Sequence, residues 1–151
     1  MIALVCYLMA MPSIEKPGDA ASNSAKSKGA IGMELSYYEV SGCLGVEMSG
    51  AWREAAMKQA IEAIRDEAIK RISTRLLIDA RKVSHPDNEM TRFFTGMYIA
   101  KTWGHPFKAA VVASPEVYNG FAEQVAVNRF ATFEVFFEEE KALEWLLESA
   151  P

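Results

Sequence analysis

The chain is organised around residues 74–88, which read TRLLIDARKVSHPDN. The apolar run Leu76-Leu77-Ile78 ends at Asp79, and the polar residues 81–87 separate it from a helical pattern. A short apolar run bounded by turn signals predicts a buried central strand, here over residues 75–80. Binding sites in open α/β sheets tend to form at the carboxyl ends of strands. We therefore expect a functional turn over residues 81–87.

Two alternating runs precede this strand. In residues 33–40 (MELSYYEV), Leu35 and Tyr37 fall on one side of the strand and the polar residues on the other. The turn signal Ser41-Gly42 follows, and residues 43–49 alternate again. Two alternating runs joined by a short glycine-containing turn predict an antiparallel β-hairpin.

Helical and strand patterns alternate through the rest of the chain. The predicted elements are a helix over residues 51–72, a strand over 75–80, a helix from about 88 to 103, a strand over 107–113, a helix starting at Ser114-Pro115, a strand over 132–137 and a helix opened by residues 138–140. The order ββαβαβαβα predicts an α/β fold whose sheet is mostly parallel and covered by helices.

The N-terminal 32 residues differ from this pattern. Residues 1–11 are almost wholly apolar, and residues 12–32 have the composition of a linker. A signal peptide would need a basic start and a cleavage site, which the segment lacks. An extra element that docks on the domain or on a second subunit, or a leader from an early start codon, is favoured instead. We therefore assign residues 1–32 to a doubtful or flexible extension and residues 33–151 to the domain.

Composition narrows the class of protein. Half of the 151 residues are hydrophobic and 24% are charged, which is typical of one globular domain. A net charge of −4 argues against a nucleic-acid binder. Cys6 and Cys43 fit no metal or disulfide pattern and indicate free thiols in a reducing compartment. No apolar run approaches the ~20 residues of a membrane span, so a cytoplasmic protein is expected.

The chain lacks the common catalytic motifs. GxSxG, the P-loop and GxGxxG are all absent, and no cofactor is predicted. His85 and His105 both precede prolines, and their spacing predicts no metal site. Asp79, Ser84 and His85 are close in sequence, but residues on one turn rarely reach the geometry of a catalytic triad. We predict no catalytic residue and expect Asp79 to bind neighbouring amides.

The second helix of the domain is unusually bulky. Met90, Phe93, Phe94, Met97 and Tyr98 are expected on its buried side, and Trp103 lies at its end. Ordinary packing against the sheet is the simplest interpretation. The alternative is that Phe93, Phe94, Met97, Tyr98 and Trp103 line an apolar pocket or a subunit interface, since aromatic and thioether side chains suit both.

Five pieces of sequence resemble one family when taken in order. They are Leu77-Ile78-Asp79, Val83-Ser84, residues 108–112 (KAAVV), residues 121–129 (FAEQVAVNR) and residues 135–146 (VFFEEEKALEWL). Together they resemble the SpoIIAA-like family of the STAS/CRAL-TRIO-like group over about residues 33–148. The resemblance implies a regulatory or binding module rather than an enzyme.

The resemblance also bears on phosphorylation. Phosphorylated members of the STAS class carry their acceptor serine in an Asp-Ser-Ser-Gly loop at the start of the second domain helix. The corresponding residues here are Asp87-Asn88-Glu89-Met90, with Asn88 at the acceptor position. An asparagine cannot acquire the charge on which such a switch depends. The resemblance to CRAL-TRIO-like folds implies an apolar ligand site as an alternative.

Two hypotheses follow. The first is a cytoplasmic, non-enzymatic STAS-like module that forms a homodimer and binds another protein, without a conventional phosphoserine switch. Its contact residues would be Arg81, Lys82, Ser84, His85, Asp87 and Asn88. The second is a carrier or sensor of a small apolar, lipid-like molecule held between the second domain helix and the sheet.

Overall fold

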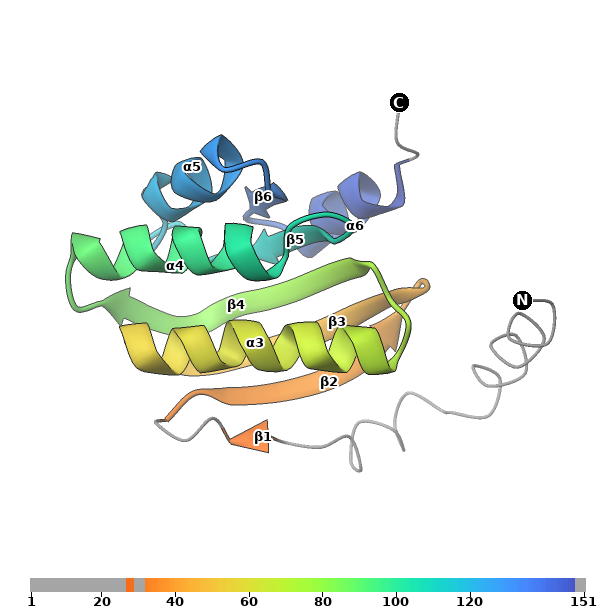
Figure 1. The fold of residues 1–151 in the computed structure, drawn as a ribbon, viewed down its shortest axis with the longest axis horizontal. Helices are drawn as coiled ribbons and strands as arrows, with labels where there is room; N and C mark the ends of the chain where they lie inside the picture. Colours follow the sequence, from red (N-terminus) through yellow and green to blue (C-terminus); the bar gives the residue numbers. More distant parts are fainter. Residues whose placement is uncertain (1–26, 29–31, 149–151) are drawn as a thin grey trace, which may run out of the picture.

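A computed structural model describes residues 27–28 and 32–148. The expectations for residues 1–26 and 29–31, including that for Cys6, lie outside these residues. Six strands form one sheet in the order β1-β2-β3-β4-β5-β6 (Figure 1). They are β1 (Ser27–Lys28), β2 (Glu34–Val40), β3 (Cys43–Trp52), β4 (Arg75–Pro86), β5 (Lys108–Val112) and β6 (Thr132–Phe136). The first three strands pair antiparallel and β3 to β6 pair parallel, which confirms the mostly parallel sheet.

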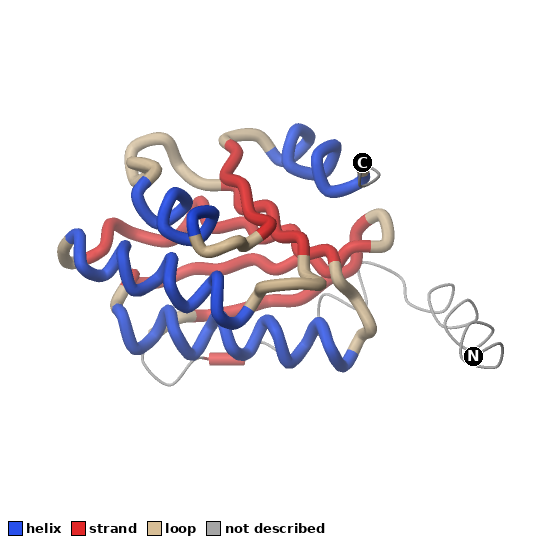
Figure 2. Tube along the Cα trace, turned by 45° about the horizontal axis from the view of Figure 1, so that its top comes forward, coloured by secondary structure: helices blue, strands red, loops and turns tan. Residues whose placement is uncertain are grey.

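Four helices among the described residues cover the sheet. They are α3 (Glu54–Lys70), α4 (Glu89–Thr102), α5 (Phe121–Asn128) and α6 (Glu139–Leu147). Each parallel strand is added on the same side of the one before it, so right-handed crossovers place α3, α4 and α5 on one face. The last helix, α6, follows β6 and lies on the opposite face (Figures 1 and 2). The predicted order ββαβαβαβα is confirmed, and the two-residue β1 is an addition from within the predicted extension.

The two faces of the sheet carry separate cores. Leu76 and Ile78 of β4 point into the large core beneath α3, α4 and α5, whereas Leu77 between them points towards α6. This alternation follows from the period of two in a strand. The smaller core contains Cys43, Leu77, Ala110, Val112, Ala142 and Leu146.

The central strand is longer than predicted. Residues 81–86, expected as a turn, continue β4 and pair with the extended end of β3 as far as Trp52↔Pro86. The pairing accommodates register shifts near Gly50, whose φ is +125°. A side chain on Gly50 would place its Cβ 2.2 Å from the Gly32 carbonyl oxygen. The sequence prediction was therefore wrong here, because polar side chains can occupy a strand that extends beyond the core.

The helix predicted from Ser114 also differs in the structure. Residues 115–117 form a single turn, in which the amides of Val117 and Tyr118 donate to the Ser114 carbonyl oxygen at 3.0 and 3.1 Å. Gly120 has φ of +82° and precedes Phe121, where α5 begins. The start signal was interpreted wrongly because the left-handed conformation at Gly120 interrupts the helical path.

Candidate functional site

The carboxyl half of β4 projects beyond its neighbour β5. Pairing between these two strands ends at Asp79↔Val112, whereas pairing with β3 continues to Pro86. Residues 80–86 therefore have a strand neighbour on one side only. They lead directly into α4, so the segment joins two rigid elements rather than forming a loose loop (Figure 1).

The six predicted contact residues lie together on this segment. Val83 is buried in the large core and Pro86 is partly buried. The exposed residues are Arg81, Lys82, Ser84, His85, Asp87 and Asn88. The structure thus places all six predicted contact residues at one accessible strand-to-helix junction.

Arg81 is engaged within the fold. The Asp79 Oδ1 atom accepts hydrogen bonds from the Arg81 amide at 3.1 Å and from Nε at 2.9 Å, and Oδ2 accepts from Nη2 at 2.7 Å. Hydrogen bonds from Arg81 hold the pKa of Asp79 below its usual value. Arg81 Nη2 also lies 3.4 Å from Glu139 Oε1 at the start of α6. The amide-binding role predicted for Asp79 is confirmed.

The remaining contact residues are less constrained. Lys82 Nζ lies 3.7 Å from Glu47 Oε1, and both side chains are well exposed. Within residues 27–28 and 32–148, the side chains of Ser84, His85 and Asp87 make no hydrogen bond. The exposed ion pair of Lys82 and Glu47 contributes little to stability. These side chains are therefore free to meet a partner.

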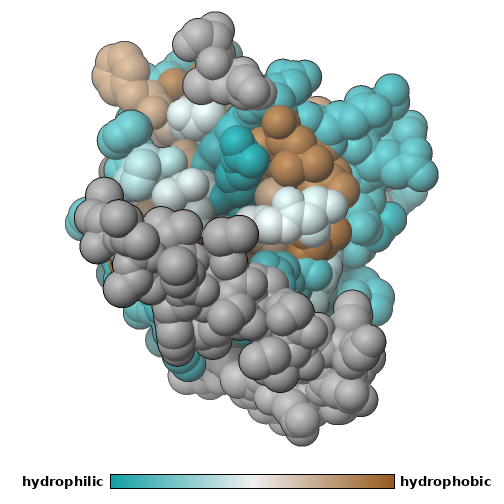
Figure 3. Space-filling model, turned by 90° about the vertical axis from the view of Figure 1, so that its right-hand side faces the viewer, coloured by the Kyte–Doolittle hydropathy of each residue, from teal (hydrophilic) through white to brown (hydrophobic). Residues whose placement is uncertain are grey.

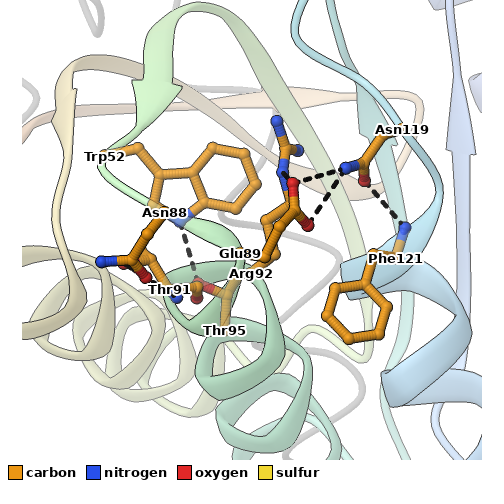
Figure 4. A network of polar contacts seen from close by, with 8 residues as sticks. All are labelled: Trp52, Asn88, Glu89, Thr91, Arg92, Thr95, Asn119 and Phe121. Carbon is orange, nitrogen blue, oxygen red and sulfur yellow. Dashed lines mark hydrogen bonds and ion pairs between the residues drawn. The ribbon is translucent and has the colours of Figure 1, made fainter.

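Asn88 is the N-cap of α4. Its side-chain Oδ1 accepts a hydrogen bond from the Thr91 amide at 3.0 Å and lies 3.4 Å from the Thr91 hydroxyl (Figure 4). The cap satisfies one of the amides that a helix start leaves without a partner. Asn88 thus has a local structural role at the start of α4.

The buried side of α4 is not the predicted one. Met90 is exposed, and Phe93, Phe94, Met97 and Tyr98 are only partly buried. The residues that face inward are Thr91, Arg92, Thr95, Gly96 and Ile99. Small side chains are favoured here because α5 packs closely: a Cβ on Gly96 would lie 2.5 Å from the Ala122 carbonyl oxygen.

The aromatic residues of α4 pack against the neighbouring helices instead. The Phe93 ring lies 6.4 Å from that of Phe121 on α5, measured between centroids. Tyr98 faces α3, where its hydroxyl donates to Glu54 Oε1 at 3.3 Å and Lys58 Nζ lies 5.4 Å from its ring. These side chains fill the two flanks of α4 and do not lie beneath it.

A cavity of about 100 Å³ lies between α4 and the sheet. Its lining is mostly apolar and comes from β3, β4, β5, β6, α3, α4, α5 and the segment before α5. Representative lining residues are Met48, Ile78, Ile99, Trp103, Val117 and Phe133. Of the five residues predicted for an apolar site, Trp103 alone lines this cavity; it is buried, and its Nε1 donates to the Ile61 carbonyl oxygen at 2.9 Å.

A polar network borders one side of the cavity (Figure 4). Trp52 Nε1 donates to Thr95 Oγ1 at 2.9 Å, and this hydroxyl donates to the Thr91 carbonyl oxygen at 2.7 Å. The Arg92 guanidinium lies 5.0 Å from the Trp52 ring, and Arg92 is 6% exposed. No sequence pattern singles out Arg92, because a charged residue among aromatics is typical of the solvent side of a helix. The available signal was the Thr91/Thr95 spacing, which places small polar residues on its face.

Two further polar residues line the cavity and satisfy each other. The Tyr118 hydroxyl donates to Glu123 Oε1, and the Val135 amide donates to Oε2 at 2.7 Å. The hydrogen bond to Glu123 raises the pKa of Tyr118 to about 12. Glu123 therefore has a donor at each oxygen and serves to tie α5 to β6.

Neither a metal site nor a membrane span is found in the described part of the chain. Over residues 27–28 and 32–148, no three His, Cys, Asp or Glu side chains group as metal ligands would. No described helix combines the length and the apolarity needed to cross a bilayer.

The opposite end of the sheet, where the parallel strands begin, has a different surface. Figure 3 shows this end, with an apolar area in brown beside hydrophilic side chains in teal. Exposed hydrophobic residues at the ends of helices here include Ile69, Ile72 and Leu147. This surface is separate from the β4–α4 segment and from the predicted contact residues.

Comparisons with known proteins agree with the geometry. The family model described as SpoIIAA-like matches residues 43–147. An anti-sigma factor antagonist from Mycobacterium paratuberculosis is similar in structure, with a TM-score of 0.56 and 18% identity over 77% of this chain and 95% of that one. An uncharacterised DUF3478-family protein from Shewanella loihica with a SpoIIAA-like fold gives 0.52 and 18% over 81% and 99%. No curated protein matches the chain.

Proposed function

The chain belongs to the SpoIIAA-like family, and from this premise we propose that it is a non-enzymatic, STAS-like regulatory module that binds another protein. The observation that supports this function is the exposed junction of β4 and α4. Arg81, Lys82, Ser84, His85, Asp87 and Asn88 are all exposed there. Exposed polar side chains on rigid elements suit specific contacts because little ordering entropy is lost on binding. A cytoplasmic location is part of the proposal, and the buried free thiol of Cys43 is consistent with it.

The proposed module acts without a conventional phosphoserine switch. Asn88 occupies the corresponding position and its side-chain oxygen caps α4. The nearest hydroxyl on the helix, that of Thr91, is buried and lies against the same cap. Modification at this helix start would therefore require the cap to open. Partner binding would instead depend on the fixed charges and shape of the segment.

A homodimer is also part of the proposal. Phe130 is 92% exposed just beyond the end of α5, and Val127 in α5 is exposed as well. Neighbouring exposed apolar side chains of this kind suit an interface between subunits. Sedimentation equilibrium should then give twice the chain mass of 16.7 kDa. A monomer throughout the micromolar range would contradict the homodimer.

The protein-binding function is tested by affinity capture from the native cell with matched variants. Arg81 is unsuitable for substitution because it holds Asp79, so the test variant is Lys82→Glu combined with His85→Glu. A protein captured by the unmodified chain should fall at least about tenfold with this variant, a loss of ~1.4 kcal/mol in binding free energy. Lys101→Glu, on an exposed residue at the far end of α4, is the control for charge. Capture that is equal for all three proteins would refute the proposed surface.

The second candidate function is binding of a small apolar molecule between α4 and the sheet. The cavity of about 100 Å³ is the observation that favours it. An engineered apolar cavity of ~150 Å³ is known to accept benzene, so a ligand of similar or smaller size is expected. The cavity is not lined by Phe93, Phe94, Met97 or Tyr98. The proposed ligand site is therefore the cavity beneath α4 and not the surface formed by these four side chains.

A further inference from the structure

We propose that the cavity beneath α4 binds a small apolar monocarboxylate whose carboxylate is held by the Arg92 guanidinium. The inference rests on the second candidate function, the apolar-ligand cavity, and adds the chemical class of the ligand. It is independent of the protein-binding surface on β4. Arg92 lines the cavity together with the apolar residues described above.

Arg92 is a buried cation whose Nε donates no hydrogen bond to any described residue. Within residues 27–28 and 32–148, its Nε is fully buried without a hydrogen-bond acceptor. Glu89 Oε1 lies 3.3 Å from this Nε, but the contact does not have hydrogen-bond geometry. Burying a charge without hydrogen bonds is costly unless a counter-charge arrives. A ligand anion would add a second counter-charge to that of Glu89 and supply the missing hydrogen-bond acceptor.

Glu89 is only a partial counter-ion. Its side chain is 64% exposed, so solvent screens its charge. Its two carboxylate oxygens also accept hydrogen bonds from Asn119 Nδ2 at 3.0 and 3.2 Å (Figure 4). Asn119 in turn is fixed, because its Oδ1 accepts from the Phe121 amide at 3.0 Å. Glu89 therefore links α4 to the segment before α5, and its recorded contact with Arg92 is to Nε alone.

The guanidinium is already oriented for an anion. Trp52 lies 5.0 Å from it, and the hydrogen bond from Trp52 Nε1 to Thr95 fixes the indole. A cation held against an aromatic ring keeps the N–H donors at its edge free. Those donors form a planar fork that matches the two oxygens of a carboxylate. The matching ligand therefore has a planar anionic head group.

The rest of the cavity defines the body of the ligand. Apolar side chains such as Ile78, Ile99 and Phe133 form most of the wall. Glu123 is the one carboxylate among the described lining residues, and both of its oxygens already have protein donors. A volume of about 100 Å³ allows a short alkyl chain or a single ring and excludes a long acyl chain. One arginine and one apolar space together specify a small monocarboxylate.

The test compares charged and neutral probes of equal shape by isothermal titration calorimetry and ¹H–¹⁵N NMR. The probes are propionate and butyrate, their amides propionamide and butyramide, and inorganic phosphate. In the unmodified chain, each carboxylate should bind at least about tenfold more tightly than its amide, which corresponds to ~1.4 kcal/mol. The amides of Thr95 and Ile99 should shift during the titration, since both residues line the cavity.

Three variants separate the alternatives. Arg92→Met should abolish the preference for carboxylates and leave amide binding unchanged, and Arg92→Gln repeats the test should the methionine variant fold poorly. Glu89→Gln should strengthen carboxylate binding, because it removes the competing charge beside Arg92. Lys101→Met removes an equal charge from the exposed end of the same helix and should change nothing.

The outcomes test the carboxylate site at Arg92 and the apolar-ligand cavity separately. Equal binding of carboxylate and amide by the unmodified chain would overturn the monocarboxylate assignment. It would not contradict binding of a small apolar molecule in the cavity. No binding of any apolar probe would overturn both. Phosphate binding as tight as that of butyrate would show a simple anion site and would also refute the proposal.

Discussion

At the scale of single residues, two arginines in this fold have opposite surroundings. Arg81 is half-exposed and makes three hydrogen bonds to Asp79, whereas Arg92 is buried and makes none among the described residues. Residue type alone does not separate these roles. The difference comes from the elements that carry them. Strand β4 places Arg81 two residues after the Asp79 carboxylate, and helix α4 places Arg92 on its buried face.

The ion pair of Asp79 and Arg81 should make stability depend on pH. Arg81 lowers the folded-state pKa of Asp79, so the pair stabilises the fold above the unfolded-state pKa. That contribution is lost as the pH falls through the lowered folded-state value. Asp79→Asn should therefore reduce the free energy of unfolding by about 1 kcal/mol at pH 7 and by less near pH 3. Urea denaturation at the two pH values measures the difference.

A matched control is available for this experiment. Asp66 pairs with Arg65 at 2.9 Å, but its side chain is largely exposed. Asp66→Asn should therefore change stability little at either pH. If Asp79→Asn were equally destabilising at pH 7 and at pH 3, the ionised pair would not be the cause.

At the scale of elements, the sequence predicted strands and helices better than it predicted their faces. Hydrophobic alternation located β2 and β3, and the buried run Leu76-Leu77-Ile78 located the start of β4. These patterns are local and periodic, so one sequence contains them. The continuation of β4 to Pro86 depends on pairing with β3, which no local pattern encodes.

The face of α4 shows the same limit at the candidate site. Hydrophobicity predicted that Phe93 and Tyr98 lie beneath the helix, but neighbours on both sides of α4 bury such residues at its flanks. The contact between α4 and α5 then selects Gly96 for the inner face. The exposure of Arg81, Lys82, Ser84, His85, Asp87 and Asn88 was predictable from their polarity, whereas their role as contact residues stays a prediction. Arg92 and the cavity were not predictable, because both depend on how three helices share one face of the sheet.

Substitution of Gly96 tests the close packing of α4 against α5, because helix propensity and overpacking change the free energy of unfolding in opposite directions. Gly96→Ala should stabilise an isolated helix by roughly 1 kcal/mol. In the folded chain the added Cβ would lie 2.5 Å from the Ala122 carbonyl oxygen and 2.7 Å from the Val125 Cβ, so α4 and α5 must separate. Overpacking of this kind costs typically 1–3 kcal/mol, and we expect a net loss of about 1 kcal/mol by thermal and urea denaturation.

The sign of the change in the free energy of unfolding decides between helix propensity and overpacking. Lys101→Ala is the control for helix propensity, because Lys101 is exposed in the same helix and should change stability by only a few tenths of a kcal/mol. A Gly96→Ala variant more stable than the original chain would show that α4 and α5 do not pack tightly at this position.

At the scale of the whole molecule, the sheet joins two cores into one unit. Among the described helices, α3, α4 and α5 cover one face and α6 covers the other (Figure 2). Adjacent residues of β4 enter different cores, Leu76 and Ile78 on one side and Leu77 on the other. Loss of packing on either face therefore exposes the same strand, and the cores should unfold together.

Leu146 tests this coupling. It is fully buried in the smaller core, and α6 is also held by Lys108, whose Nζ donates to the Trp145 carbonyl oxygen at 2.5 Å. Leu146→Ala should lower the free energy of unfolding by about 3 kcal/mol. Leu147→Ala, at the exposed neighbouring position, should cost less than about 1 kcal/mol. Tryptophan fluorescence and far-UV circular dichroism should report one shared urea transition for both variants, since Trp52 and Trp103 lie on the opposite face from Trp145. Two separated transitions in Leu146→Ala would mean that α6 undocks independently and that the two faces are not coupled through β4.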